Sequence, residues 1–170
     1  MKKQFIVFDQ LAMLFAMFAL MFFAASCNSS SKENTSAAFD MAAAQKAIDA
    51  RNAVFMDAWN KGDSVGVSNC YLEDAKVMAP NMPAVSGRNN ILHFLAENIK
   101  QAPAIKVSTN NLFGDDNLLA EDGSWTLSDK DGKVLDHGKQ IELWKKDGDT
   151  WKLLRDCFNT DTPLPAPAKE

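Results

Sequence analysis

Two acidic residues in the second half of the chain, Glu121 and Asp156, have the chemistry of a general base. Each lies in a predicted strand whose alternation gives it apolar neighbours on the same face. A carboxylate in an apolar cavity has a raised pKa and can accept a proton near neutral pH. Such a base could abstract a proton next to a carbonyl, while Asn52, Tyr71 or a tryptophan N–H stabilises the developing oxyanion.

A structural role is the favoured interpretation of both carboxylates, because ion-pair networks shift carboxylate pKa values as readily as catalytic sites do. Asp156 would then form a buried hydrogen bond, or an ion pair with Lys139 on the neighbouring strand. Glu121 would pair with Asn52 or Arg51. Asn52 falls beside the apolar stripe of a helix, so it is either a core asparagine bonded to backbone or a pocket residue.

The remaining candidates are aromatic residues and two histidines. Most of the four tryptophans (Trp59, Trp125, Trp144 and Trp151) are expected in the core, and one or two could line a pocket for a flat apolar ligand. His93 projects away from the apolar side of its helix and His137 lies near the start of a strand, so both are expected to be exposed and neither is a candidate base.

Apolar spacing and turn residues predict the elements that must position these side chains. Asp40 is expected to cap a helix that runs through Lys61. Its apolar side consists of Ala44, Ile48, Phe55 and Trp59. Further elements are predicted in the order helix 64–71, strand 75–79, strand 84–86, helix 88–101 and strand 104–113.

Residues 118–161 predict a meander of three antiparallel strands, joined by turns at Asp131-Gly132 and Asp147-Gly148. Helices come first and the long sheet last, which is typical of an α+β fold. The sheet is expected to bury one face against the first and third helices. Side chains alternate between the two faces of a strand, so each of the three strands has one set of residues on a common face. The sets are Leu119, Glu121, Gly123 and Trp125 in the first strand, Lys139, Ile141 and Leu143 in the second, and Lys152, Leu154, Asp156 and Phe158 in the third.

The first 26 residues are typical of an export signal. A positive start is followed by the unbroken apolar run 11–25, which is too short for a membrane span and suits a secretory signal. The segment AASC (24–27) resembles the bacterial lipobox, although Ala24 replaces the usual leucine. The resemblance implies lipidation of Cys27; an ordinary cleaved signal and an uncleaved anchor are the alternatives. A tether is expected over residues 27–39 and a Pro-rich, unstructured tail over 162–170, which leaves one domain at 40–161.

The charge of the chain excludes several partners. The net charge is −4, and it becomes about −5 without residues 1–26. Nucleic-acid binding requires a basic surface, so it is not expected. Electrostatic binding to a membrane surface is excluded for the same reason. Membrane attachment would therefore depend on covalently bound lipid, and a single acyl chain anchors a protein only weakly. The protein is therefore expected in the bacterial cell envelope, facing the periplasm or the cell surface.

The other two cysteines, Cys70 and Cys157, have no CxxC or Cys/His neighbour, so neither a metal site nor a cofactor is predicted. In an exported protein they could form a disulfide. Two buried, inert thiols are the favoured interpretation.

Five short segments in this order resemble the cone-shaped nuclear-transport-factor-2-like superfamily, and more narrowly its SnoaL-like branch. They are AWNKGD (58–63), YLEDA (71–75), VSGR (85–88), EDGSW (121–125) and RDCFNTD (155–161). The resemblance covers residues 42–161. It implies a strongly bent antiparallel sheet around the first helix, a cavity open at one end with Glu121 and Asp156 directed into it, and frequent dimerisation through the outer sheet face.

The resemblance does not fix a function, since members include ketosteroid isomerases, polyketide cyclases, dehydratases, transport factors and subunits without chemistry. The isomerase pattern matches poorly because the chain has a single tyrosine, Tyr71. Three functions follow as hypotheses: a lipid-anchored protein that binds a small hydrophobic or amphipathic molecule, a cofactor-independent isomerase, cyclase or dehydratase, and a dimeric interaction module. The ligand-binding candidates are Asn52, Trp59, Tyr71, Trp125, Lys139 and Phe158.

Overall fold

A computed structural model describes residues 39–163. The predicted signal segment 1–26, the lipidation site at Cys27, the tether up to residue 38 and most of the Pro-rich tail lie outside the described residues. None of the helices within 39–163 is long and apolar enough to cross a membrane.

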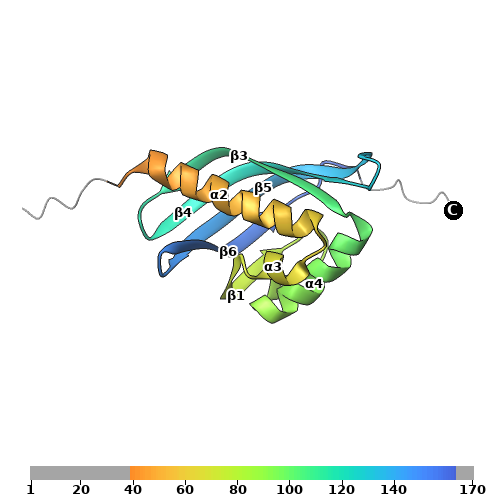
Figure 1. The fold of residues 1–170 in the computed structure, drawn as a ribbon, viewed down its shortest axis with the longest axis horizontal. Coiled ribbons are helices and arrows are strands. Elements are labelled where there is room, and N and C mark those ends of the chain that lie inside the picture. The colour runs from red at the N-terminus through yellow and green to blue at the C-terminus, as the bar shows by residue number, and fades with distance from the viewer. Residues whose placement is uncertain (1–38, 164–170) are drawn as a thin grey trace, which may run out of the picture. The chain divides into compact units, whose positions relative to one another are not determined.

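The described residues form three helices and six strands in an α+β arrangement, as the sequence predicts. The elements are α2 (Met41–Asn60), α3 (Ser64–Ser68), β1 (Tyr71–Met78), β2 (Val85–Ser86), α4 (Arg88–Gln101), β3 (Ala104–Gly114), β4 (Leu118–Ser128), β5 (Val134–Asp147) and β6 (Thr150–Phe158). The single curved sheet has the strand order β2-β1-β6-β5-β4-β3. Helix α2 lies across this sheet, and α3 and α4 gather with β1 at one end (Figure 1).

The helix boundaries follow from capping. The Asp40 carboxylate accepts a hydrogen bond from the Ala43 N–H (3.0 Å) and starts α2, while Asp63 accepts from the Gly66 N–H (2.8 Å) and starts α3. Between them Gly62 adopts φ +77°, a conformation that costs little only for glycine. The chain therefore turns sharply, and α3 packs against both α2 and α4.

Tyr71 begins a strand, which corrects the predicted helix 64–71. The helix ends at Ser68, and the Leu153 N–H of β6 donates to the Cys70 carbonyl (2.9 Å), which draws the chain into the sheet. From Tyr71 onward β1 runs parallel to β6 and antiparallel to β2. The sheet is antiparallel at every other pairing, so β1–β6 is the exception to the predicted antiparallel arrangement.

The core lies between the concave face of the sheet and the helices. The predicted stripe of α2 is buried, as are Ile91, Leu95 and Ile99 of α4. Alternation in β4 also holds, since Leu119, Glu121, Gly123 and Trp125 are all buried.

A β-bulge makes the predicted face of β6 partly wrong. Leu143 pairs with Arg155 but the next residue, Trp144, pairs with Leu153, so Leu154 is an extra residue without a partner. A bulge shifts the alternation of a strand by one position. Asp156 and Phe158 therefore share the inner face with Trp151 and Leu153, while Lys152 and Leu154 do not.

Candidate functional site

Three buried carboxylates lie side by side on adjacent strands. Glu121 of β4 pairs in register with Glu142 of β5, and Glu142 pairs with Asp156 of β6. Their exposed fractions are 0%, 6% and 8%. Burial and mutual repulsion both oppose ionisation of such a row. The hydrogen bonds around each carboxylate therefore decide what each can do.

Glu121 is fully provided with donors. Asn52 Nδ2 (2.9 Å) and Thr109 Oγ1 (2.6 Å) donate to its Oε1, and Trp144 Nε1 donates to its Oε2 (2.8 Å). These donors come from α2, β3 and β5, so the carboxylate joins three elements. The structural role that the sequence suggested for Glu121, a buried hydrogen bond with Asn52, is therefore the one observed.

Asp156 has one donor, the Tyr71 hydroxyl, at 2.6 Å from Oδ2. Burial raises the pKa of Asp156 to about 6, against the lowering effect of the Tyr71 hydrogen bond, and the charge of Glu121 adds to the rise. Burial and the neighbouring Asp156 also hold the pKa of Tyr71 well above its ordinary value, so its hydroxyl keeps the proton that it donates. Asp156 therefore exchanges its proton near neutral pH.

Glu142 stands between the other two carboxylates, and one of its two oxygens has no hydrogen-bond partner. Its Oε2 is buried and makes no hydrogen bond. Burial is the main reason that its pKa is raised well above the ordinary range, and the charges of Asp156 and Glu121 raise it further. Glu142 therefore binds a proton more readily than an exposed glutamate does.

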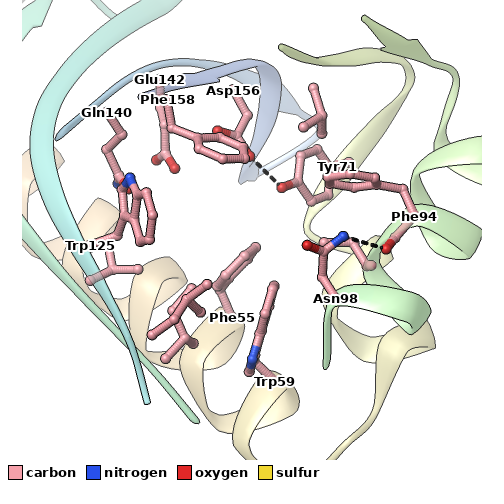
Figure 2. A pocket seen from close by; sticks show the side chains of 15 residues that line it. Phe55, Trp59, Tyr71, Phe94, Asn98, Trp125, Gln140, Glu142, Asp156 and Phe158 are labelled. Atoms are coloured by element: carbon pink, nitrogen blue, oxygen red, sulfur yellow. Dashed lines mark hydrogen bonds between the residues drawn. The ribbon is translucent and has the colours of Figure 1, made fainter. Parts of the chain in front are cut away.

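A cavity opens beside Glu142 and Asp156. The cavity volume is about 70 Å³, which is below the roughly 300–1,000 Å³ of drug-sized ligand sites, so it suits a small molecule or one end of a larger one. The lining comes from every main element of the fold: Phe55, Trp59, Tyr71, Val77, Phe94, Leu95, Asn98, Ile105, Val107, Trp125, Leu127, Gln140, Glu142, Asp156 and Phe158. Figure 2 shows Gln140, Glu142 and Asp156 on one side and Phe55 and Trp59 opposite them.

Three polar atoms in the cavity wall are buried without a partner. They are Trp125 Nε1, Gln140 Nε2 and Glu142 Oε2. Unpaired buried polar groups are costly, on the order of 1–3 kcal/mol each, and they are rare in stable proteins. The other polar groups of the wall are engaged: Trp59 Nε1 donates to the Ala102 carbonyl (2.8 Å) and Asn98 Nδ2 to the Phe94 carbonyl (2.8 Å).

Close packing fixes the position of Trp125. Its ring meets Phe158 edge to face with centroids 5.7 Å apart. Gly138 lies opposite Trp125 in the β4–β5 pair, and a Cβ there would collide with the Asn159 carbonyl and lie 2.9 Å from the Trp125 ring. Glycine at this position therefore lets β5 approach closely enough to hold the indole against the cavity.

The structure separates the predicted site residues into two groups. Trp59, Tyr71, Trp125, Asp156 and Phe158 all line the cavity. Asn52 and Glu121 do not line it, and they bond to each other in the core beside it. Asn52 and Tyr71 already donate to Glu121 and Asp156, so neither has the free donor that the predicted oxyanion role required.

The placement of Lys139 in the cavity is wrong. Its side chain is 66% exposed and forms an ion pair with Asp161, not with Asp156. Lys139, Ile141 and Leu143 do share a face, but it is the outer face of the sheet, and Ile141 is 59% exposed there. The residues between them point inward, which is why Gln140 and Glu142 line the cavity.

Sequence reasoning missed Gln140 and Glu142. The signal that could have found them is Trp144, because a tryptophan two residues after Glu142 marks the face of β5 that carries the larger apolar side chain. Within residues 39–163 no group of three His, Cys, Asp or Glu side chains is arranged to hold a metal ion.

The two described cysteines are free. Cys70 is buried and accepts a long hydrogen bond from Arg51 at 3.5 Å, but Cys157 is exposed on the outer face. The prediction of two buried thiols is therefore wrong for Cys157. This residue lies between the inward-facing Asp156 and Phe158, so strand alternation directs its side chain outward.

Comparison with known proteins agrees with the fold. Residues 53–155 match the family described as the SnoaL-like domain. A ketosteroid isomerase-like protein from Erwinia carotovora atroseptica is 18% identical with a TM-score of 0.58, over 69% of this chain and 96% of that protein. A protein of unknown function from Mycobacterium tuberculosis is 18% identical with a TM-score of 0.62, over 73% and 75%.

A third solved structure, an NTF2-like protein with a cystatin-like fold from Novosphingobium aromaticivorans, is 11% identical with a TM-score of 0.62, over 71% of this chain and 84% of that one. No curated protein shows significant sequence similarity to the chain. At these identities the structural matches establish a shared fold, and the function must be argued from the cavity.

Proposed function

We propose a ligand-binding function for this chain, which belongs to the SnoaL-like domain family. The ligand is a small amphipathic molecule with an apolar body and a polar group. The apolar body packs against the aromatic wall formed by Phe55, Trp59 and Phe158. The polar group meets the edge where Trp125, Gln140 and Glu142 lie.

One observation carries the proposal: the unpartnered atoms Trp125 Nε1, Gln140 Nε2 and Glu142 Oε2 all line one apolar cavity. A ligand that supplies hydrogen bonds to them removes a desolvation cost that the empty protein carries. Small-molecule sites share this design, in which few polar groups are set in a mainly apolar wall.

A neutral aromatic ketone tests the proposal. We expect the fluorescent naphthyl ketone prodan to bind saturably to residues 39–163, with a blue-shifted emission. Trp125→Phe removes the indole N–H and should weaken binding by about fivefold, the effect of one hydrogen bond. Trp151→Phe is the matched control, because Trp151 is equally buried but does not line the cavity. Equal weakening by both variants, or no saturable binding, would contradict the proposal.

A second candidate function is proton transfer at carbon, favoured by the cavity carboxylate Asp156 and its pKa of about 6. Ionised Asp156 would take a proton next to a ligand carbonyl, and the N–H groups of Trp125 and Gln140 would stabilise the resulting oxyanion. The expected sign is a hydrogen–deuterium exchange rate at the ketone α-carbon that rises as the pH passes through 6, seen by NMR. Asp156→Asn should abolish it, while a rate that does not differ between the two proteins excludes this function.

Export, lipid anchoring at Cys27 and assembly as a homodimer belong to the same proposal. Support for the anchor comes from the apolar run 11–25 followed by AASC (24–27). Support for a dimer comes from exposed apolar residues such as Leu135 and Ile141 on β5. Cys27→Ala should abolish processing that is sensitive to globomycin, and Ile141→Glu should shift the mass in solution from dimer to monomer.

A further inference from the structure

The cavity wall contains acidic side chains without a matching basic one. Asp156 and Glu142 line it, and Glu121 lies in register behind them. Among the described residues 39–163, no Lys, Arg or His side chain lines this cavity. In a low-dielectric setting such a charge is felt strongly by any charged group that enters. An anionic ligand would therefore be rejected.

The basic residues near the carboxylate row are directed elsewhere. On α2, the Arg51 guanidinium faces Cys70 Sγ at 3.5 Å. On β6, Lys152 Nζ is 2.6 Å from Asp147 Oδ2 near the surface. The groups that face Asp156 and Glu142 are instead the neutral hydroxyl of Tyr71 on β1 and the carboxylate of Glu121 on β4.

Aromatic rings make up the rest of the chamber. Trp125 and Phe158 meet edge to face, and Phe55 packs against Trp59 (centroids 5.9 Å) and against Tyr71 (6.3 Å). Ring faces attract ammonium groups, and the attraction is largest where water is excluded. The aromatic rings and the carboxylates of the cavity therefore both favour a positively charged group.

We infer that the cavity selects amphiphilic amines: the ammonium group sits at Glu142 Oε2 and Asp156, and the apolar body lies among the rings of Phe55, Trp59 and Phe158. This inference rests on the proposed ligand-binding function and narrows its ligand class. It accounts for the unpartnered Glu142 Oε2, which receives an ammonium hydrogen bond. It also gives the buried carboxylates the counter-charge that the protein itself does not place in the cavity.

Proton release should accompany binding of an amine. Burial raises the pKa of both carboxyls in the free protein, so each binds a proton more readily than an exposed carboxyl does. An ammonium group beside them favours their ionised forms and lowers those pKa values. Affinity for the amine should therefore rise as the pH increases from 5 to 7, whereas affinity for a neutral ligand should stay level.

Three probes with one apolar body and different charge test the inference: 4-phenylbutylamine, 4-phenylbutanol and 4-phenylbutyrate, titrated by calorimetry at pH 7.5. The amine is protonated at this pH, as a lysine side chain is. We expect the amine to bind about tenfold more tightly than the alcohol, and the carboxylate to show no binding. Buffers of different ionisation enthalpy should reveal proton release with the amine only.

Two variants assign the effect to the carboxylates. Glu142→Gln and Asp156→Asn should each weaken amine binding by about tenfold and weaken alcohol binding clearly less, so that the preference for the amine over the alcohol falls. Alcohol binding also verifies that each variant retains its cavity. Asp147→Asn, a surface carboxylate paired with Lys152, is the control and should change neither.

The outcomes separate this inference from the proposed function. Alcohol binding equal to or tighter than amine binding overturns the inference and leaves the ligand-binding function standing. Equal loss of both probes in Glu142→Gln overturns the inference too, because it shows a general effect on the cavity. Failure of all three probes to bind overturns both.

Discussion

Glu121 and Glu142 face each other across β4 and β5, yet their surroundings are opposite. Both are glutamates on the inner face, in register and almost fully buried. Glu121 receives hydrogen bonds from Asn52, Thr109 and Trp144, whereas Glu142 Oε2 receives none. One carboxylate joins three elements of the fold, and the other is left to the cavity.

The difference teaches that burial alone does not define a functional carboxylate here. Glu121 is the more deeply buried of the two, but its donors stabilise it as part of the core. The pKa of Glu142 is strongly raised because burial and the charges of Asp156 and Glu121 outweigh the lowering effect of Trp144. The distribution of donors therefore separates a carboxylate that is bonded into the core from one that faces the cavity.

Replacing each glutamate by leucine should give the largest contrast. Glu121→Leu leaves the donors of Asn52, Thr109 and Trp144 unpaired in the core, at a cost of about 4 kcal/mol in the free energy of unfolding. Glu142→Leu removes a buried group that lacks a partner, so stability should stay level or rise by up to about 2 kcal/mol. Urea denaturation of the two variants measures both values.

Similar losses of stability in the two leucine variants would contradict the comparison. The Glu121→Gln variant serves as a milder check, because its amide oxygen still accepts from Asn52 and Thr109 while its amide nitrogen opposes the Trp144 N–H. Its loss should be smaller than that of Glu121→Leu.

The pH dependence of stability should show a smaller effect at Asp156. Its pKa is raised to about 6 in the folded protein from an ordinary 3.8, so the folded state binds the proton more tightly than the unfolded state does. The contribution of this carboxyl to stability is therefore fully present below about pH 3 and is lost as the pH rises through 6. Asp156→Asn removes this loss and should be more stable than wild type by about 2 kcal/mol at pH 7.

The gain from Asp156→Asn should vanish below about pH 3, where the wild-type carboxyl is protonated in both states. Thermal or urea unfolding at several pH values measures this trend. A gain that does not depend on pH would mean that packing, and not ionisation, causes it. Asp147→Asn should show no such gain, because its exposed carboxyl has a pKa that Lys152 lowers.

The smallest effect is expected at Lys139, three residues before Glu142 on the same strand. Lys139 is largely exposed and its ion pair with Asp161 lies at the surface. Lys139→Ala should change the free energy of unfolding by about 0.5 kcal/mol or less and leave binding of prodan unchanged. A measurable loss of prodan binding would show that β5 presents the opposite face to the ligand.

Much of the fold was predictable because it depends on local patterns. The cap at Asp40, the stripe of α2 and the alternation of β4 are short-range signals, and each predicts an observed element. The partnership of Asn52 with Glu121 was also anticipated, since a buried amide and a buried carboxylate each require a partner.

The missed site residues, Gln140 and Glu142, depended on the phase of one strand, β5. In β5, both alternating sets contain apolar residues, and Ile141 and Leu143 favoured the wrong set as the inner one. The sheet resolves this choice through its pairing, because Glu142 must follow the face of Glu121 across β4. In β6 the bulge at Leu154 changes the phase within the strand, and the sequence of β6 alone carries no mark of it.

The parallel pairing of β1 with β6 sets the order in which the domain can fold. The Tyr71–Asp156 hydrogen bond spans 85 positions along the chain, and contacts between such distant segments form late because closing a long loop has a large entropic cost. When synthesis has reached only residue 149, β1 is already made but β6, its parallel partner, is not. The last strand carries Asp156 and Phe158 and completes the cavity wall, so the proposed binding site exists only once the whole domain has been made and folded.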